Sequence, residues 1–99
     1  MTDEERSRQQ IAELRAIIGH LDIVLRDILS RRAWVVREIQ REKRRLGLPV
    51  RDPSREAEVF HSMSLGLRGD KFTYPEEVVR KVFADLMAAS EDIAEEEGR

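Results

Sequence analysis

The first half of the chain carries its apolar residues at intervals of three and four positions, which is the spacing of one face of an α-helix. No proline interrupts this stretch, and Gly19 is its one weak position for a helix. The pattern therefore predicts a single helix over about residues 6–46. The apolar positions that carry it are Ile11, Leu14, Ile17, Ile18, Leu21, Val24, Leu25, Ile28, Leu29, Val35, Val36, Ile39 and Leu46.

A second helix is predicted after a break of a few residues. Gly47 is a typical residue at the end of a helix, and Asp52 followed by Pro53 forms a good N-cap and first turn for the next one. We therefore predict a helix over about residues 53–67. Its apolar residues are Val59, Phe60, Met63 and Leu67.

A third helix is predicted over about residues 75–96. Gly69 and Asp70 supply a turn before it, and Pro75 suits its first turn. Its apolar face is formed by Val78, Val79, Val82, Phe83, Leu86, Met87 and Ile93. No part of the sequence alternates in the manner of a strand, so the predicted fold class is all-α, with three helices of which the first is very long.

The length of the first helix predicts a second chain. At ~1.5 Å per residue it would be about 60 Å long, whereas a compact chain of this size has a radius of gyration of roughly 13 Å. The remaining residues cannot cover such a helix. We therefore expect an obligate homodimer, in which the helices of two chains form an intertwined bundle.

Composition narrows the class of protein. The 99 residues suit one domain, expected to span 1–99, and 18 Lys and Arg oppose 20 Asp and Glu for a net charge of −2. That balance predicts neither a nucleic-acid partner nor an anionic membrane, although residues 31–45 are locally basic. The polar start, the absence of cysteine and the lack of a long apolar run favour a cytoplasmic protein.

Two cations interrupt the apolar face of the first helix. Arg32 and Lys43 lie 11 residues, or three turns, apart on the line through Leu21, Ile28 and Ile39. A long basic side chain in this place extends to solvent, pairs with a carboxylate or binds an anion, because a buried unpaired charge is costly. Two such cations on one face favour an anionic ligand.

Other polar residues allow both a structural and a functional interpretation. Glu56 lies on the apolar line of the second helix, where it could pair with Arg32 or Lys43 or contact a ligand. Ser90 lies on the apolar face of the third helix, and its hydroxyl could simply bond the preceding turn. The two histidines, His20 and His61, have no partners at metal-ligand spacing, so no metal site is predicted.

The order of these residues closely resembles the all-helical class of chorismate mutase over residues 11–95. The segments that carry the resemblance are Leu14-Arg15, Leu21-Asp22, Arg32, Lys43, Pro49-Val50-Arg51-Asp52, Arg55-Glu56, Phe83 and Ser90. The resemblance implies an intertwined dimer of three-helix chains with two active sites, each using residues of both chains. It agrees with the dimer expected from helix length.

The resemblance implies the Claisen rearrangement of chorismate to prephenate in aromatic amino-acid biosynthesis, an isomerase reaction with no covalent intermediate, metal or cofactor. Chorismate is a dianion that must fold into a compact conformer, and its ether oxygen gains electron density as the carbon–oxygen bond breaks. Cations that are already in place before the reaction can bind the folded dianion and stabilise the charge that develops on the ether oxygen.

The resemblance also implies which residues hold the substrate carboxylates. Arg15 of the partner subunit and Arg32 of the same chain would clamp the two groups, because a guanidinium can bond a carboxylate with two parallel hydrogen bonds. Arg55 would add to the positive charge around these carboxylates. Ser90 would contact a carboxylate.

The reacting bond and the ring hydroxyl are assigned to three further residues. By resemblance, Lys43 donates to the ether oxygen, where a compact ammonium suits a single developing charge. Glu56 and the backbone at Asp52 receive the ring hydroxyl. Lys43, Arg32 and Glu56 are thus the expected catalytic residues.

One position departs from the family pattern. Members usually carry Gln, sometimes Glu, one turn after Ser90, where this chain has Ala94, and Glu91 stands where an apolar residue is usual. Losing one donor to the ether oxygen costs ~3 kcal/mol of transition-state stabilisation. The departure leaves room for a relative acting as an isochorismate lyase or a 4-amino-4-deoxychorismate mutase, whereas the intact PVRDPSRE segment favours chorismate.

Two further interpretations concern partners. A non-catalytic helical module could use the basic residues 31–45 to bind an acidic partner or nucleic acid, but it would give Arg32, Lys43 and Glu56 no reason to lie on apolar faces. A mutase could also dock onto another enzyme of the shikimate pathway.

Overall fold

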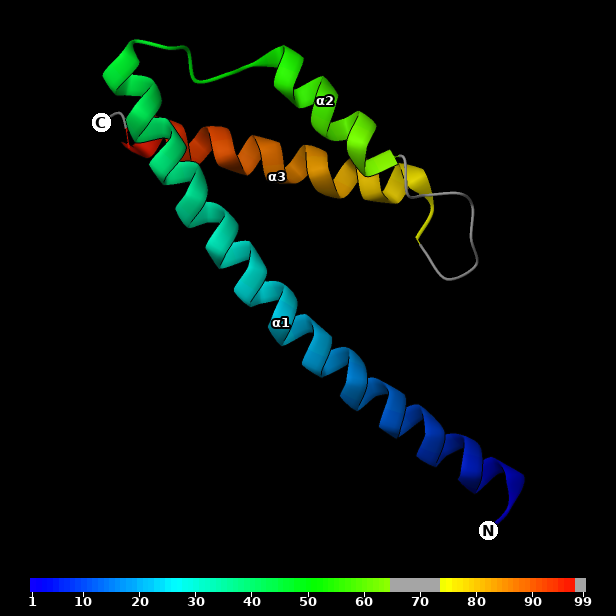
Figure 1. The fold of residues 1–99 in the computed structure, drawn as a ribbon. Coiled ribbons are helices and arrows are strands. Elements are labelled where there is room, and N and C mark those ends of the chain that lie inside the picture. Colours follow the sequence, from blue (N-terminus) through cyan, green and yellow to red (C-terminus); the bar gives the residue numbers. More distant parts are fainter. Residues whose placement is uncertain (65–73, 98–99) are drawn as a thin grey trace. The chain divides into compact units, whose positions relative to one another are not determined.

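The computed structural model describes residues 1–64 and 74–97, which form three α-helices (Figure 1). The helices are α1 (Asp3–Leu46), α2 (Pro53–Ser64) and α3 (Glu76–Glu97). The all-α prediction with one long N-terminal helix is confirmed. The observed starts of α1 and α3 differ from the predicted starts near residues 6 and 75, and the predicted end of the second helix at residue 67 lies outside the described residues.

The start of α1 is set by Thr2. Its Oγ1 accepts a hydrogen bond from the backbone N–H of Glu5 at 3.1 Å, which satisfies one of the free donors of the first turn. Asp3, Glu4 and Glu5 place carboxylates in that turn, where they interact favourably with the helix dipole. This cap explains why the helix begins one turn earlier than its apolar pattern predicts.

The end of α1 is a Schellman motif at Gly47. This residue has a φ of 71°, which glycine adopts without steric cost. Its N–H bonds the carbonyl of Arg44 at 3.2 Å, and the N–H of Leu48 bonds the carbonyl of Lys43 at 2.8 Å. Gly47 therefore ends the helix, as the sequence predicts.

The two shorter helices also begin at capping interactions. At α2, the Asp52 carboxylate accepts the backbone N–H of Arg55 at 3.1 Å, as expected of an N-cap. At α3, the carbonyl of Pro75 accepts the N–H groups of Val78 and Val79. Pro75 therefore precedes the helix as its cap, which explains the start at Glu76.

The chain divides into two compact units, Met1–Trp34 and Val35–Arg99, and α1 contributes to both. In the first unit, the apolar face predicted for the long helix is exposed from Ile11 to Leu29. Apart from Met1 and Thr2, this unit consists of α1 alone, so nothing within it covers that face.

The second unit contains the end of α1 and the packed pair α2 and α3. Its partly buried apolar side chains include Val59, Phe60, Phe83, Leu86, Met87 and Ile93. Among the described residues only Ala94 and Gln40 fall in the buried class, at 4% and 8% exposure. The core of the isolated chain is therefore small.

Candidate active site

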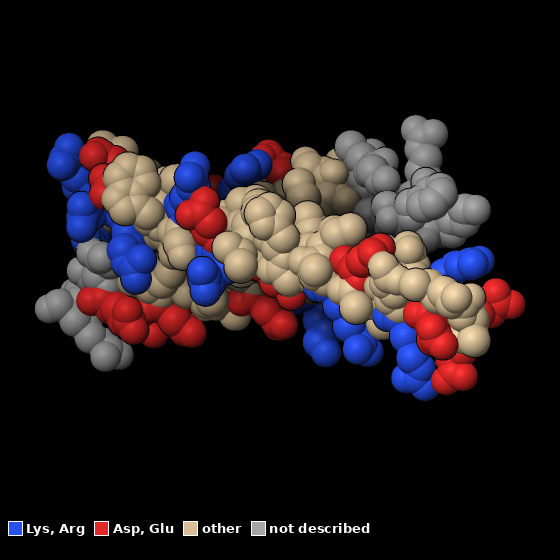
Figure 2. Space-filling view, turned by 90° about the horizontal axis from the view of Figure 1, so that it is seen from below, with Lys and Arg blue, Asp and Glu red and all other residues tan. Residues whose placement is uncertain are grey.

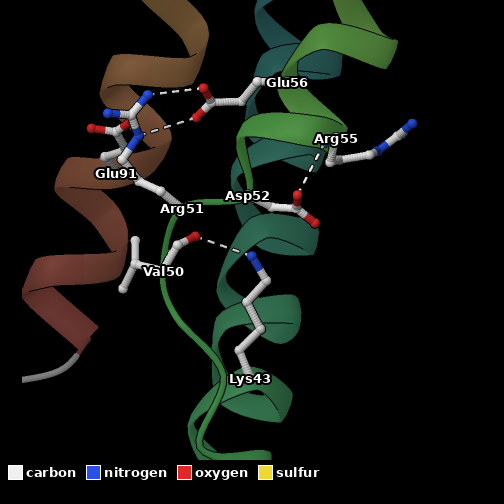
Figure 3. Close-up of polar contacts among 7 residues, drawn as sticks. All are labelled: Lys43, Val50, Arg51, Asp52, Arg55, Glu56 and Glu91. Atoms are coloured by element: carbon white, nitrogen blue, oxygen red, sulfur yellow. Dashed lines mark hydrogen bonds and ion pairs between the residues drawn. The ribbon is translucent and has the colours of Figure 1, made fainter.

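The connecting segment between α1 and α2, residues 47–52, folds back toward the end of α1 and holds Lys43 (Figure 3). The Lys43 ammonium donates a hydrogen bond to the backbone carbonyl of Val50 at 3.0 Å, and the side chain is half-buried. An ammonium has three N–H bonds, so two others can serve a ligand. The segment thus fixes a positive charge in place.

Arg51, the next residue of the segment, bridges two carboxylates. Its Nη2 lies 2.9 Å from Glu56 Oε2, and its Nε lies 3.4 Å from Glu56 Oε1. The same Nε lies 3.0 Å from Oε1 of Glu91 on α3. Figure 3 shows the guanidinium between the two acids. Arg51 is therefore a cationic partner of Glu56. The sequence analysis considered only Arg32 and Lys43 for this pairing.

The two acids affect the titration of Arg51. The hydrogen bond and the charge of Glu56, followed by the charge of Glu91, raise the pKa of the Arg51 guanidinium above its usual value. The guanidinium therefore stays positively charged at physiological pH. Glu56 is the more sheltered of the two acids, with its side chain 26% exposed against 36% for Glu91.

Asp52 and Arg55 lie on the other side of the same turn. The Asp52 side chain is engaged in capping α2, and its carbonyl accepts the N–H of Glu56 at 3.0 Å, so its backbone position is fixed at both ends. The Arg55 guanidinium contacts Glu58 at 3.4 Å and points away from Lys43 and Glu56 (Figure 3). In the chain alone, Arg55 therefore faces solvent.

Ser90 and Ala94 occupy successive turns of α3. The Ser90 hydroxyl donates to the carbonyl of Leu86 at 2.7 Å, which is the bond to the preceding turn that its sequence context allows. Ala94 is enclosed, so the position at which the resemblance implies an amide donor faces inward. The expected substrate role of Ser90 stays a prediction.

Arg15 and Arg32 belong to the N-terminal unit. Arg15 is exposed and borders a shallow hollow that Arg8, Ile11 and Ala12 also line. Arg32 is half-buried on α1. Their roles as carboxylate clamps remain predictions.

Charges of both signs are interspersed over the face shown in Figure 2. Within the basic stretch, Arg31 pairs with Asp27, Arg41 with Glu38 and Arg45 with Glu42. These neighbouring acids reduce the net positive field of residues 31–45. No helix in the described part of the chain combines the length and the apolarity needed to cross a membrane.

Three residues of this region were not singled out by the sequence pattern as contributors to a site. Arg51 lies in the conspicuous PVRDPSRE segment, and Glu91 is a charged residue next to the apolar face of α3, but nothing local pairs them. Gln40 is a polar residue beside Ile39 and is buried. Its neighbours one turn away on the helix include Arg37, Lys43 and Arg44, so the local sequence did not indicate this burial.

Comparison with known proteins identifies relatives of this architecture. The chain matches the family described as chorismate mutase type II over residues 14–95. Form II of the chorismate mutase from Thermus thermophilus is similar, with 32% identity, a TM-score of 0.78, and 87% of this chain and 94% of that chain covered. Form I from the same organism shares 33% identity, with a TM-score of 0.75 and coverages of 82% and 98%. No curated protein matches the chain.

Proposed function

The chain belongs to the type II chorismate mutase family, and on this basis we propose that it rearranges chorismate to prephenate as a cytoplasmic enzyme of aromatic amino-acid biosynthesis. Type II chorismate mutases are isomerases. The observation that carries the proposal for this chain is the half-buried Lys43 ammonium, held at 3.0 Å by the Val50 carbonyl within the segment that also places Glu56.

The proposed mechanism is electrostatic. Lys43 donates to the ether oxygen as its negative charge develops, and the fixed position of the ammonium avoids reorganisation during the reaction. Glu56 and the Asp52 backbone hold the ring hydroxyl. Arg32 and Ser90 hold the carboxylate groups, and Arg55 adds to the positive charge around them. These contacts select the compact conformer in which the two reacting carbons meet.

The complete site requires a homodimer in this proposal. The face of α1 from Ile11 to Leu29 is apolar and exposed in the chain alone, and a contiguous apolar surface of this kind is typical of a protein interface. A second chain along this face would bring Arg15 of the partner subunit to the site. Docking of the dimer onto another shikimate-pathway enzyme is compatible with the proposal, and addition of such an enzyme would then change the turnover rate.

A purely binding function is less well supported. The acids Asp27, Glu38 and Glu42 pair with arginines of the basic stretch, so that stretch does not present an uninterrupted cationic surface. A related substrate is favoured by one observation, the alanine at position 94. Product identification separates isochorismate lyase and 4-amino-4-deoxychorismate mutase from the proposed mutase.

The test is the loss of chorismate absorbance with the purified protein, together with identification of prephenate. Lys43→Ala is expected to lower kcat by about a hundredfold or more while the helical circular dichroism is retained. The matched control is Lys81→Ala, which removes an exposed lysine from α3. Wild-type turnover in Lys43→Ala would contradict the proposed role of this lysine.

A second pair of variants tests the carboxylate clamp. Arg32→Ala is expected to lower kcat/KM for chorismate by roughly tenfold or more, because a charged hydrogen-bond donor to the substrate is lost. Arg31→Ala is its control, since Arg31 is exposed and pairs with Asp27 at 3.0 Å on the same helix. Equal activity in the two variants would rule out a special role for Arg32.

A further inference from the structure

Arg51 makes ion pairs between separate elements of the fold. The ion pairs of Arg31, Arg45 and Arg80 each join residues three or four positions apart on one helix. Those of Arg51 join the connecting segment to α2 through Glu56 and to α3 through Glu91. Pairs within one helix turn leave the packing of elements unchanged, whereas the two contacts of Arg51 constrain three elements at once.

The three consecutive residues around Arg51 all have fixed contacts. Val50 gives its carbonyl to Lys43, Arg51 bonds Glu56, and Asp52 caps α2. A shift of the backbone at Arg51 would therefore move both the acceptor that holds the lysine and the start of the helix that carries Glu56. Glu91 is the contact by which α3 restrains this backbone through the Arg51 side chain.

The geometry at Glu56 is that of an oriented carboxylate. Arg51 approaches both of its oxygens, at 2.9 Å and 3.4 Å, so rotation of the carboxylate is restricted. The Glu91 carboxylate in turn forms an ion pair with the Arg51 Nε at 3.0 Å, which restricts the guanidinium. The chain of contacts therefore runs from α3 through one guanidinium to the sheltered acid on α2.

We propose that Arg51 and Glu91 are positioning residues of the active site: Glu91 anchors the Arg51 guanidinium to α3, and Arg51 orients the Glu56 carboxylate toward the substrate hydroxyl. The inference rests on the proposed mutase function and assigns the pair no direct contact with substrate. It makes α3 a determinant of the rate through Glu91.

A double-mutant cycle tests the proposal in the full-length protein. Arg51→Ala is expected to lower kcat about tenfold to a hundredfold, and Glu91→Ala about threefold to tenfold, since residues in one network are coupled energetically. Because Glu91 acts through Arg51, adding Glu91→Ala to Arg51→Ala should lower kcat no further. Arg51→Lys keeps the charge without the two-point contact and should recover activity only in part.

The control is Glu95→Ala, which removes an exposed acid one turn further along α3 and should leave kcat unchanged. Two results would overturn the inference: independent effects of the two substitutions, which multiply in the double variant, or a fall in melting temperature with kcat at saturating chorismate unchanged. The second result is the one that a merely structural ion pair predicts.

Hydrogen exchange provides a readout that needs no catalysis. The N–H groups of Arg55 and Glu56 bond Asp52, next to the anchored residue. Glu91→Ala should speed the exchange of these two amides, whereas Glu95→Ala should not, and equal exchange in both variants would contradict the anchoring. A wild-type protein inactive on chorismate would contradict the proposed function alone, because the exchange experiment still decides the anchoring.

Discussion

At the scale of single residues, Ala94 and Glu91 are the two positions at which the sequence departs from the resemblance described above. Ala94 is one of two buried residues in the described chain, so its methyl group occupies an enclosed inward position. Glu91, three positions earlier, is committed to Arg51. The face of α3 that would carry a second donor to the ether oxygen therefore carries a small apolar residue and an anchoring acid.

Restoring the donor tests the role of this position. Ala94→Gln is expected to raise kcat, by as much as about a hundredfold, because a positioned amide donor contributes that much to oxyanion stabilisation. The larger side chain must fit an enclosed site, so the melting temperature should fall by several degrees. Steady-state kinetics and thermal unfolding measure the two effects.

Ala94→Leu is the control for size alone. It should lower the melting temperature without raising kcat, because it fills the same space with no donor. An unchanged rate in Ala94→Gln would mean that the ether oxygen is already satisfied by another group or by an ordered water.

At the scale of the elements, both ends of the connecting segment are fixed by local motifs. Gly47 closes α1 in a left-handed conformation, and Asp52 caps α2. These motifs hold the short segment that carries Val50 and Arg51. A change at either motif is therefore expected to act on the site through the backbone.

Two glycine substitutions should have opposite effects on stability. Gly47→Ala places a Cβ at a φ of 71°, where no neighbouring atom lies within 4 Å of it, so the strain comes from the backbone alone. It should destabilise the protein by about 1 kcal/mol. Gly19→Ala lies inside α1, where alanine is the better helix former by ~1 kcal/mol, and should stabilise it.

Thermal unfolding of the two variants measures this contrast as shifts of a few degrees of opposite sign. A stabilising Gly47→Ala would contradict the role of the positive φ. A destabilising Gly19→Ala would show that a second chain encloses this position, because the single chain leaves the added Cβ in open space.

At the scale of the whole molecule, the single chain leaves the apolar face of α1 exposed to solvent. Ile18 and Leu21 are each 58% exposed in the middle of this face. Exposed apolar surface of this extent is unfavourable in water at ~25 cal/mol per Å². In the proposed dimer this surface is removed from water, and Arg15 of the partner subunit enters the site.

A charge placed on this face should therefore disrupt both assembly and activity. Leu21→Lys is expected to produce monomers in sedimentation velocity and to reduce mutase turnover roughly tenfold or more, because a buried unpaired ammonium is costly in an interface. His20→Lys introduces the same group at an exposed neighbouring position and should leave both properties unchanged. A fully active Leu21→Lys monomer would show that the site is complete in one chain.

The helices and their caps could be predicted from the sequence because they depend on neighbouring residues. The three-and-four spacing of apolar residues indicated the long first helix, and Gly47 and Asp52 marked its end and the next start. The extra turn at Thr2 was missed because a cap without apolar neighbours adds nothing to that periodicity. The candidate residues Lys43 and Glu56 were identifiable because their charges interrupt apolar faces.

Contacts between residues on different elements could not be predicted in this way. Glu56 pairs with Arg51, which also pairs with Glu91 on another helix, and Lys43 is held by a backbone carbonyl. Sequence spacing fixes which side of one helix a residue occupies, but the distance between side chains on different elements depends on how those elements pack. For that reason the elements and the charged positions follow from the order of the residues, whereas the packing of the folded chain determines which charges meet.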